Sequence, residues 1–204
     1  MSSSKPVPPP LLPQRPTRAD ARRNYDRLVA AAEVVFAEQG NEASLDEIAR
    51  RAGVGSGTLY RHFANREAVM TAVFWERVQA LCAEGERLLT GPSPTGSLVT
   101  WLRMLIELTA QRGLATMLMS GQQEATLQLF RACRQAMTAT AAPLLRRAQR
   151  EGDIRPDLSV ADMITFSHAI AAATERMPPG EAHGDRLLTL LVHGLRVRAE
   201  GRHD

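Results

Sequence analysis

Apolar residues recur at intervals of three and four along most of this chain, which is the spacing of one face of an α-helix. The clearest stripe lies between residues 25 and 36 and is followed by Gly40, a residue type that commonly terminates helices. Its apolar positions are Tyr25, Leu28, Val29, Ala32, Val35 and Phe36. No segment of useful length alternates between apolar and polar residues as a half-buried strand does. The pattern therefore predicts an all-α fold with about nine helices.

Glycine and proline residues indicate where these helices end. The loop at residues 91–96, Gly-Pro-Ser-Pro-Thr-Gly, separates four N-terminal helices from the remainder. Beyond this loop we expect helices over residues 97–111, 114–121, 124–151, 159–176 and 185–200. Pro143 lies inside the segment 124–151, and it is predicted to kink or split that helix because proline cannot donate a hydrogen bond to residue 139.

Residues 44–63, SLDEIARRAGVGSGTLYRHF, predict two short helices joined by a glycine turn. Ser44 and Glu47 form a capping-box pattern, in which the serine accepts an early backbone N–H and the glutamate bonds back to the cap. Six apolar side chains can form a small core between the helices: Leu45, Ile48, Ala49, Val54, Leu59 and Phe63. This arrangement is a helix-turn-helix, whose second helix enters the major groove of DNA. We call residues 44–63 the reading head.

The reading head closely resembles the DNA-binding domain of the TetR family of transcriptional regulators. The resemblance rests on the run from Gly53 to Phe63 and on Asn65-Arg-Glu-Ala, and it extends over residues 20–75. It implies a helix-turn-helix DNA-binding domain over residues 18–65. A helical regulatory, ligand-binding and dimerisation domain is then expected over 66–204, where the resemblance is weaker. It also implies a bacterial protein of the cytoplasm.

The resemblance implies roles for individual residues at the DNA. The residues implied to hold phosphates are Ser44, Thr58, Tyr60, His62 and Arg66. Those implied to read bases are Ser56, Gly57 and Arg61, since arginine suits guanine and glycine allows close backbone approach. Two positions depart from the family pattern. Gly55 stands where many relatives have a capping serine, so the cap can pass to Ser56, and Asp46 stands where some members have a basic residue.

Residues 1–17 are predicted to form an extended, mobile tail, because six of the chain's 12 prolines lie within the first 16 residues. No apolar segment of the kind found in secretory signals follows Lys5. Two roles remain open for this tail. It is either a disordered leader or a flexible arm that touches DNA phosphates through Lys5, Arg15 and Arg18.

Pliable apolar side chains are frequent in the second domain. TetR-like proteins bind an effector among the fourth to eighth helices, so some of these residues are expected to line a pocket, although each of them can equally belong to the core. The expected lining is Trp75, Trp101, Met104, Leu105, Leu108, Met117, Phe130, Cys133, Met137 and Phe166, with Gln122 and His168 as polar anchors. Neither paired carboxylates nor a strongly basic cluster accompanies them, which favours a small, fairly hydrophobic effector.

The last two predicted helices carry more apolar positions than a single core-facing stripe requires. The resemblance implies that two copies of each build a four-helix dimer interface. The residues expected there are Met163, Ile170, Leu187, Leu191 and Leu195. A homodimer presents its reading heads about one turn of DNA apart, roughly 34–36 Å, and therefore predicts a palindromic operator.

Composition and charge narrow the classes of function. The two cysteines lie far apart, the later histidines lack metal-ligand spacing, and no phosphate-binding or nucleophile motif occurs, so we expect no enzyme, metal or cofactor. No apolar run approaches the roughly 18 residues of a membrane span, so we expect no membrane partner. The net charge is only +3, but residues 1–66 hold ten basic and seven acidic residues while the rest hold fifteen of each. The excess therefore lies at the DNA-facing end.

The leading hypothesis is a ligand-responsive, homodimeric repressor, with activation or a ligand-independent role left open. The alternative is a small-molecule-binding protein without a role in DNA regulation. Salt-sensitive affinity for DNA distinguishes the two, because it arises from contacts with phosphates.

Overall fold

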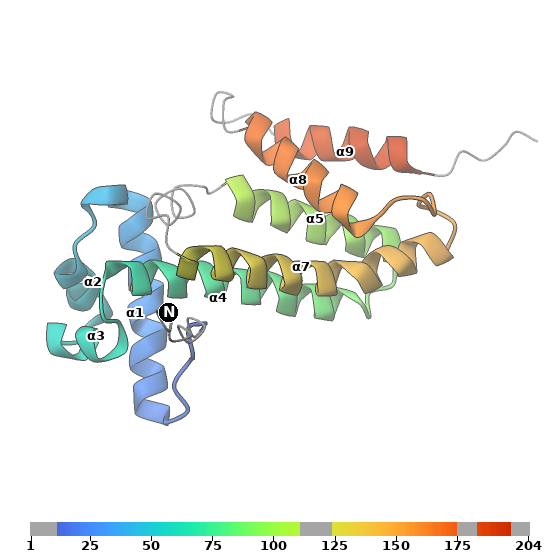
Figure 1. Ribbon diagram of the computed structural model, residues 1–204. Helices are drawn as coiled ribbons and strands as arrows, with labels where there is room; N and C mark the ends of the chain where they lie inside the picture. Colours follow the sequence, from blue (N-terminus) through green and yellow to red (C-terminus); the bar gives the residue numbers. More distant parts are fainter. Residues whose placement is uncertain (1–11, 111–123, 175–182, 197–204) are drawn as a thin grey trace, which may run out of the picture. The chain divides into compact units, whose positions relative to one another are not determined.

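A computed structural model describes residues 12–110, 124–174 and 183–196 (Figure 1). These residues form eight α-helices and one 3-10 turn, and no strand occurs among them, which confirms the predicted all-α fold. The elements are α1 (Ala19–Gln39), η1 (Gly40–Glu42), α2 (Leu45–Ala52), α3 (Ser56–His62), α4 (Arg66–Leu88), α5 (Pro94–Ala110), α7 (Glu124–Arg150), α8 (Val160–Thr174) and α9 (His183–Leu195). The helix expected over 114–121 lies outside the described residues.

Two features of these helices differ from the sequence pattern. α5 begins at Pro94 rather than at residue 97, because the Ser93 hydroxyl accepts the N–H of Gly96 at 3.1 Å and proline suits the first turn of a helix. α7 continues through Pro143 to Arg150. Of the two expected effects, a split at this proline is therefore wrong, and a kink stays a prediction.

The chain forms two compact units. The first contains the residues up to 76 together with the segment 124–133, and the second contains residues 77–110 and those from 134 onward. α4 and α7 each contribute residues to both units. No helix in the described ranges is long and apolar enough to cross a membrane.

The first unit is organised by α1, which packs against α2 and α3. Its buried apolar stripe is the one expected from the sequence: Tyr25, Leu28, Val29, Ala32, Val35 and Phe36. The turn between α2 and α3 depends on Gly53, whose φ of 64° lies in the left-handed region that favours glycine. Arg27 of α1 fills the space beside Gly53 and donates from Nη2 to its carbonyl oxygen at 3.2 Å. A side chain at residue 53 therefore meets both backbone strain and a guanidinium group.

The second unit is built around Trp101. This side chain is fully buried and donates its indole N–H to the carbonyl oxygen of Leu81 at 3.2 Å. Its ring lies against Gly85, where an added Cβ atom would come within 2.8 Å of the indole nitrogen and would collide with the methyl group of Thr140. α4, α5 and α7 thus approach one another closely at a position that has room only for glycine. On another face, α5 packs against α8 and α9.

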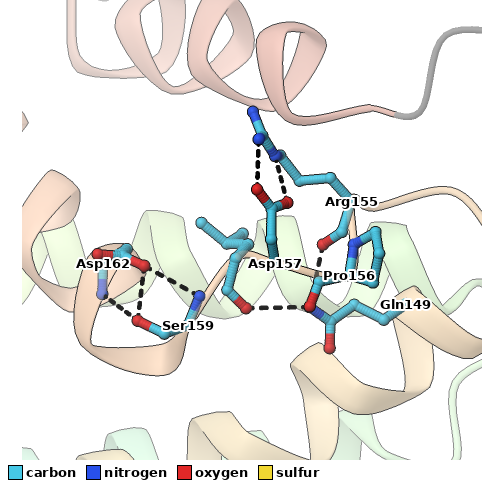
Figure 2. A network of polar contacts seen from close by, with 7 residues as sticks. Gln149, Arg155, Pro156, Asp157, Ser159 and Asp162 are labelled. Atoms are coloured by element: carbon cyan, nitrogen blue, oxygen red, sulfur yellow. Dashed lines mark hydrogen bonds and ion pairs between the residues drawn. The ribbon is translucent and has the colours of Figure 1, made fainter.

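A polar network holds the connection between α7 and α8 (Figure 2). The amide nitrogen of Gln149 donates to three carbonyl oxygens, those of Arg155 at 3.0 Å, Pro156 at 3.3 Å and Leu158 at 3.0 Å. Ser159 and Asp162 cap α8 reciprocally, and the hydrogen bonds from Ser159 hold the pKa of Asp162 below its usual value. These contacts are structural. Asp162 serves as part of the cap of α8.

Candidate nucleic-acid interface

The helix-turn-helix is formed by α2 and α3, which pack together through the inner faces of both helices. Ile48, Ala49 and Ala52 are buried on α2, and Leu59 is buried on α3. Phe63, directly after α3, completes this core. Leu45 and Val54 are half-buried at its edge. The shared core predicted from the sequence is therefore present.

The opposite face of α3 is exposed. It carries Ser56, Gly57, Tyr60 and Arg61, and the Tyr60 side chain is 53% exposed although it is a large aromatic. A Cβ atom added at Gly57 would meet no atom within 4 Å, so the backbone at that point is open to an incoming surface. All three residues expected to read bases, Ser56, Gly57 and Arg61, thus lie on one accessible face of the helix.

The residues expected to hold phosphates surround this face with different degrees of exposure. Tyr60 is exposed, whereas Thr58 and His62 are half-buried. The His62 ring packs near Phe63 and Tyr25, with ring centroids 6.2 and 6.3 Å apart. Packing against these neighbours fixes the position of the imidazole while leaving part of it accessible.

Ser44 forms half of the expected capping box. Its hydroxyl accepts the backbone N–H of Asp46 at 3.2 Å. Glu47, which was expected to bond back to the cap, instead accepts hydrogen bonds from Arg50 and Arg51 at 2.7 Å. These bonds lower the pKa of Glu47 to about 2. Arg51 also pairs with Glu38 of α1 at 2.7 Å. The two arginines of α2 are therefore neutralised by carboxylates within the same unit.

Arg66 has a structural role that the sequence did not reveal. Its guanidinium group is half-buried and donates from Nη1 to the carbonyl oxygen of Ala43 and from Nη2 to that of Gly40 at 2.9 Å. It also lies over the ring of Phe36, with Cζ 5.3 Å from the ring centroid. Arg66 thus fastens the start of α4 to the segment between α1 and α2. The contact with a phosphate expected of this residue would have to use its remaining N–H groups.

The cap of α3 differs from the expectation. Gly55 is the capping residue, without a side-chain hydrogen bond, and Ser56 is the first residue of the helix. The Ser56 hydroxyl instead donates to Oδ1 of Asp46, on α2, at 2.8 Å. The cap therefore does not pass to Ser56, and this hydroxyl joins the two helices of the reading head.

Tyr25 connects α1 with the end of α3. The side chain is buried, and its ring packs against Phe63 with centroids 5.4 Å apart. Burial and the nearby carboxylate of Glu76 raise the pKa of Tyr25 to about 12. The phenol is therefore neutral at physiological pH and serves as a packing group between α1, α3 and α4.

In the described part of the tail, residues 12–17, Arg15 is bound to α1. Arg15 donates from Nε and Nη2 to both carboxylate oxygens of Asp26, at 2.7 and 2.5 Å. Arg18 is exposed at the start of α1, and Lys5 lies outside the described residues. Arg15 is therefore bound to Asp26 of α1, which does not fit its expected place in a flexible arm.

The residues expected to line an effector pocket differ in burial. Trp101, Leu105, Cys133 and Met137 are buried, whereas Trp75, Met104, Leu108 and Phe130 are half-buried. Phe166 and His168 are exposed on α8, and Met117 and Gln122 lie outside the described residues. Phe130 packs edge to face against Phe74, which the sequence reasoning did not include, with centroids 5.3 Å apart. The exposure of Phe166 and His168 does not fit a pocket within the subunit.

The residues expected at a dimer interface also differ in burial. Met163 and Ile170 are only 2% and 9% exposed, because they face the core of their own subunit. Leu187, Leu191 and Leu195 are half-buried. The large apolar side chains left exposed on α8 and α9 are Phe166 and Leu190. The outward stripe of α8 therefore contains Phe166 in place of Met163 and Ile170.

Two family descriptions match this chain. Residues 28–73 match "Bacterial regulatory proteins, tetR family", and residues 93–197 match "Transcriptional regulator SbtR-like, C-terminal domain". Among curated proteins, the HTH-type transcriptional repressor BepR of Brucella suis is 26% identical over 198 residues, covering 90% of this chain and 92% of BepR. The HTH-type transcriptional regulator UidR of Escherichia coli is 26% identical over 148 residues, 71% of this chain and 76% of UidR.

Solved structures give the same result over most of the chain. The TetR transcriptional regulator SCO0520 from Streptomyces coelicolor is 35% identical with a TM-score of 0.73, covering 86% of this chain and 99% of that one. A TetR transcription regulatory protein from Mycobacterium vanbaalenii is 33% identical with a TM-score of 0.71, covering 89% and 100%. The helix-turn-helix, both family matches and these relatives agree: the chain belongs to the TetR family of DNA-binding transcriptional regulators and is not an enzyme.

Proposed function

We propose that this protein is a homodimeric repressor that leaves a palindromic operator when a small, fairly hydrophobic effector binds. The observation that carries the proposal is the accessible face of α3, on which an exposed tyrosine and arginine surround an open glycine backbone. The assignment as a repressor is supported by BepR, which is named as one and is similar over most of both chains.

Contacts with DNA divide into two kinds in this proposal. Thr58, Tyr60, His62 and Arg66, with the backbone N–H groups after Ser44, hold phosphates and set the register of the protein on the duplex. Arg61 reads a base, because its guanidinium group matches the two acceptors of guanine in the major groove. Ser56 and Gly57 lie on the same face, and Gly57 allows the backbone to come close to the bases.

The effector is proposed to bind among apolar residues of α4, α5 and α7. Met104 and Leu108, on α5 in the second unit, are half-buried side chains, so they can change their contacts without the removal of a fully packed core. α4 begins with Arg66, at the reading head, and continues to Leu88. An effector releases DNA only if it binds more tightly to the helix arrangement that does not fit the operator.

The DNA contact is tested by titrating the full-length protein with duplexes from the region upstream of its own gene and with random DNA of equal length. We expect Arg61→Ala to weaken specific binding by about 1–3 kcal/mol and to bring it closer to random DNA, because a base contact is lost. Arg134→Ala removes the same charge from an exposed position on α7 and serves as the control. Equal losses for specific and random DNA would contradict base reading by Arg61. Salt-independent binding of both would contradict the proposed function.

The dimer is proposed to form through the outer faces of α8 and α9. Leu190 is 60% exposed there, and a large exposed apolar side chain is typical of a surface that a partner covers. We expect Leu190→Glu to convert the dimer to a monomer at micromolar concentration in sedimentation, because dimerisation would bury a carboxylate without a partner. Leu127→Glu is the matched control, since Leu127 is 51% exposed on α7. A Leu190→Glu protein that remains dimeric would place the interface elsewhere.

A further inference from the structure

The hydrogen bond between Ser56 and Asp46 changes what the reading head can recognise. Ser56 Oγ donates to Oδ1 of Asp46 at 2.8 Å, and it thereby uses the only hydrogen that a serine hydroxyl can donate. Asp46 has no hydrogen to donate when it is ionised. Together the two side chains can accept hydrogen bonds but cannot donate any. A serine hydroxyl without this bond can accept a hydrogen bond from a base or donate one to it. The Ser56–Asp46 pair can only accept a hydrogen bond from a donor group of the base.

Both side chains lie on an accessible surface. Asp46 and Ser56 are exposed, and Ser56 is adjacent to Gly57, where the backbone is open. Within the described part of the chain, no hydrogen bond reaches Oδ2 of Asp46, so this oxygen remains available. The arginines of the same helix, Arg50 and Arg51, are bound to Glu47. A carboxylate oxygen with a fixed orientation is therefore presented beside the residues that face DNA.

The major groove offers few partners for such a group. Guanine presents two acceptors, and thymine presents one acceptor and a methyl group, so both leave the carboxylate unpaired. Adenine presents an amino group next to an acceptor nitrogen, N7, which a carboxylate disfavours. Cytosine presents the N4 amino group without a neighbouring acceptor on its own edge, and it is the base that Asp and Glu accept from.

We propose that Asp46 and Ser56 form an acceptor-only site that selects cytosine, through its N4 amino group, at one position of each operator half-site. Arg61 and this site then read bases of opposite chemistry, since arginine donates to guanine and the pair accepts from cytosine. This inference rests on the proposed function, because it assumes that the α3 face enters the major groove.

The test is selection of preferred sites from a randomised duplex pool by the full-length protein. We expect the wild type to enrich cytosine at one position per half-site. Asp46→Asn should reduce that preference about tenfold, because the asparagine amide adds a donor that guanine and thymine can accept. Ser56→Ala, which leaves the carboxylate without its orienting bond, should reduce the preference by a smaller factor. Preferences at the other positions should remain.

The control is Asp20→Asn, which removes the same charge from an exposed carboxylate on α1 that is paired with Arg23. It should leave the base preference unchanged. Melting curves show whether each variant is folded. If Asp46→Asn does not fold, Ser56→Ala still tests the proposal. Sites that are enriched by the wild type and keep the same cytosine preference in Asp46→Asn and Ser56→Ala would overturn the proposal and leave the proposed function intact. No enriched site for the wild type would overturn the proposed function itself.

Discussion

Replacing Trp101 by alanine is expected to lower the free energy of unfolding by about 3–5 kcal/mol. The side chain is fully buried, its N–H donates to the Leu81 carbonyl oxygen, and its ring fills the space beside Gly85. Truncation removes the packing of the whole indole and leaves a cavity between helices. The cavity cannot collapse easily, because backbone hydrogen bonds hold these helices and because Gly85 has no side chain to move into the space.

Urea denaturation followed by circular dichroism measures this change. Trp101→Phe is the matched control, since it keeps an aromatic ring and loses only the N–H and part of the volume, so it should cost clearly less than the alanine variant. The chain has only one other tryptophan, Trp75, which remains as a fluorescence probe in both variants. A loss of less than about 1 kcal/mol in Trp101→Ala would indicate that the indole lines open space, as a pocket residue does, rather than the core.

Replacing Arg66 by alanine is expected to affect both stability and DNA binding. The guanidinium group bonds the carbonyl oxygens of Gly40 and Ala43 and covers Phe36, and hydrogen bonds to charged groups contribute about 1.5–3 kcal/mol each. Because Arg66 is only half-buried, water can replace part of both bonds in the variant, so we expect the free energy of unfolding to fall by about 2–3 kcal/mol, less than the sum of two such bonds. If Arg66 also holds a phosphate, the slope of log K against log salt should decrease by about 1 for operator and random DNA alike.

Arg66→Lys separates these two roles. Lysine keeps the charge but cannot bridge two carbonyl oxygens with a planar fork, so this variant should lose stability and retain the salt slope. Unfolding titrations and binding at several salt concentrations, on the same preparations, measure both quantities. An unchanged salt slope in Arg66→Ala would show that the residue acts only as a structural clamp, and unchanged stability in Arg66→Ala would contradict the clamp.

The helix-turn-helix could be predicted because its determinants are local. The glycine turn, the small residues of α2 and the spacing of Leu59 and Phe63 all lie within one short segment. The hydrogen bonds of Arg66 could not be predicted, because they join residues 23 and 26 positions apart. The bond between Ser56 and Asp46 likewise spans ten positions. In each case the sequence alone predicted a role at the surface. The hydrogen-bond partners of Arg66 and Ser56 depend on how the helices pack.

The face of α8 was misjudged for a different reason. Its inner stripe includes Ser167, a polar residue that is buried because its hydroxyl donates to the Met163 carbonyl oxygen at 2.9 Å. Met163 and Ile170, which were expected at a dimer interface, share this inner stripe with Ser167, whereas Phe166 is exposed. A serine that satisfies its hydrogen bond within the helix can occupy a core position, so apolar periodicity alone could not orient this helix.

The packing of Phe74 against Phe130 has a consequence for chimeric regulators. Such hybrids join the DNA-binding part of one family member to the effector-binding part of another, and the natural junction falls in the gap between the two family matches, residues 74–92. A junction placed after Phe74 would take Phe74 from the parent of the DNA-binding part and Phe130 from the other parent. Both rings nevertheless belong to one compact unit. A hybrid that exchanges residues 124–133 together with the residues up to 76, which form one compact unit, keeps this aromatic pair intact, and its DNA-binding part then retains the side chains with which it packs.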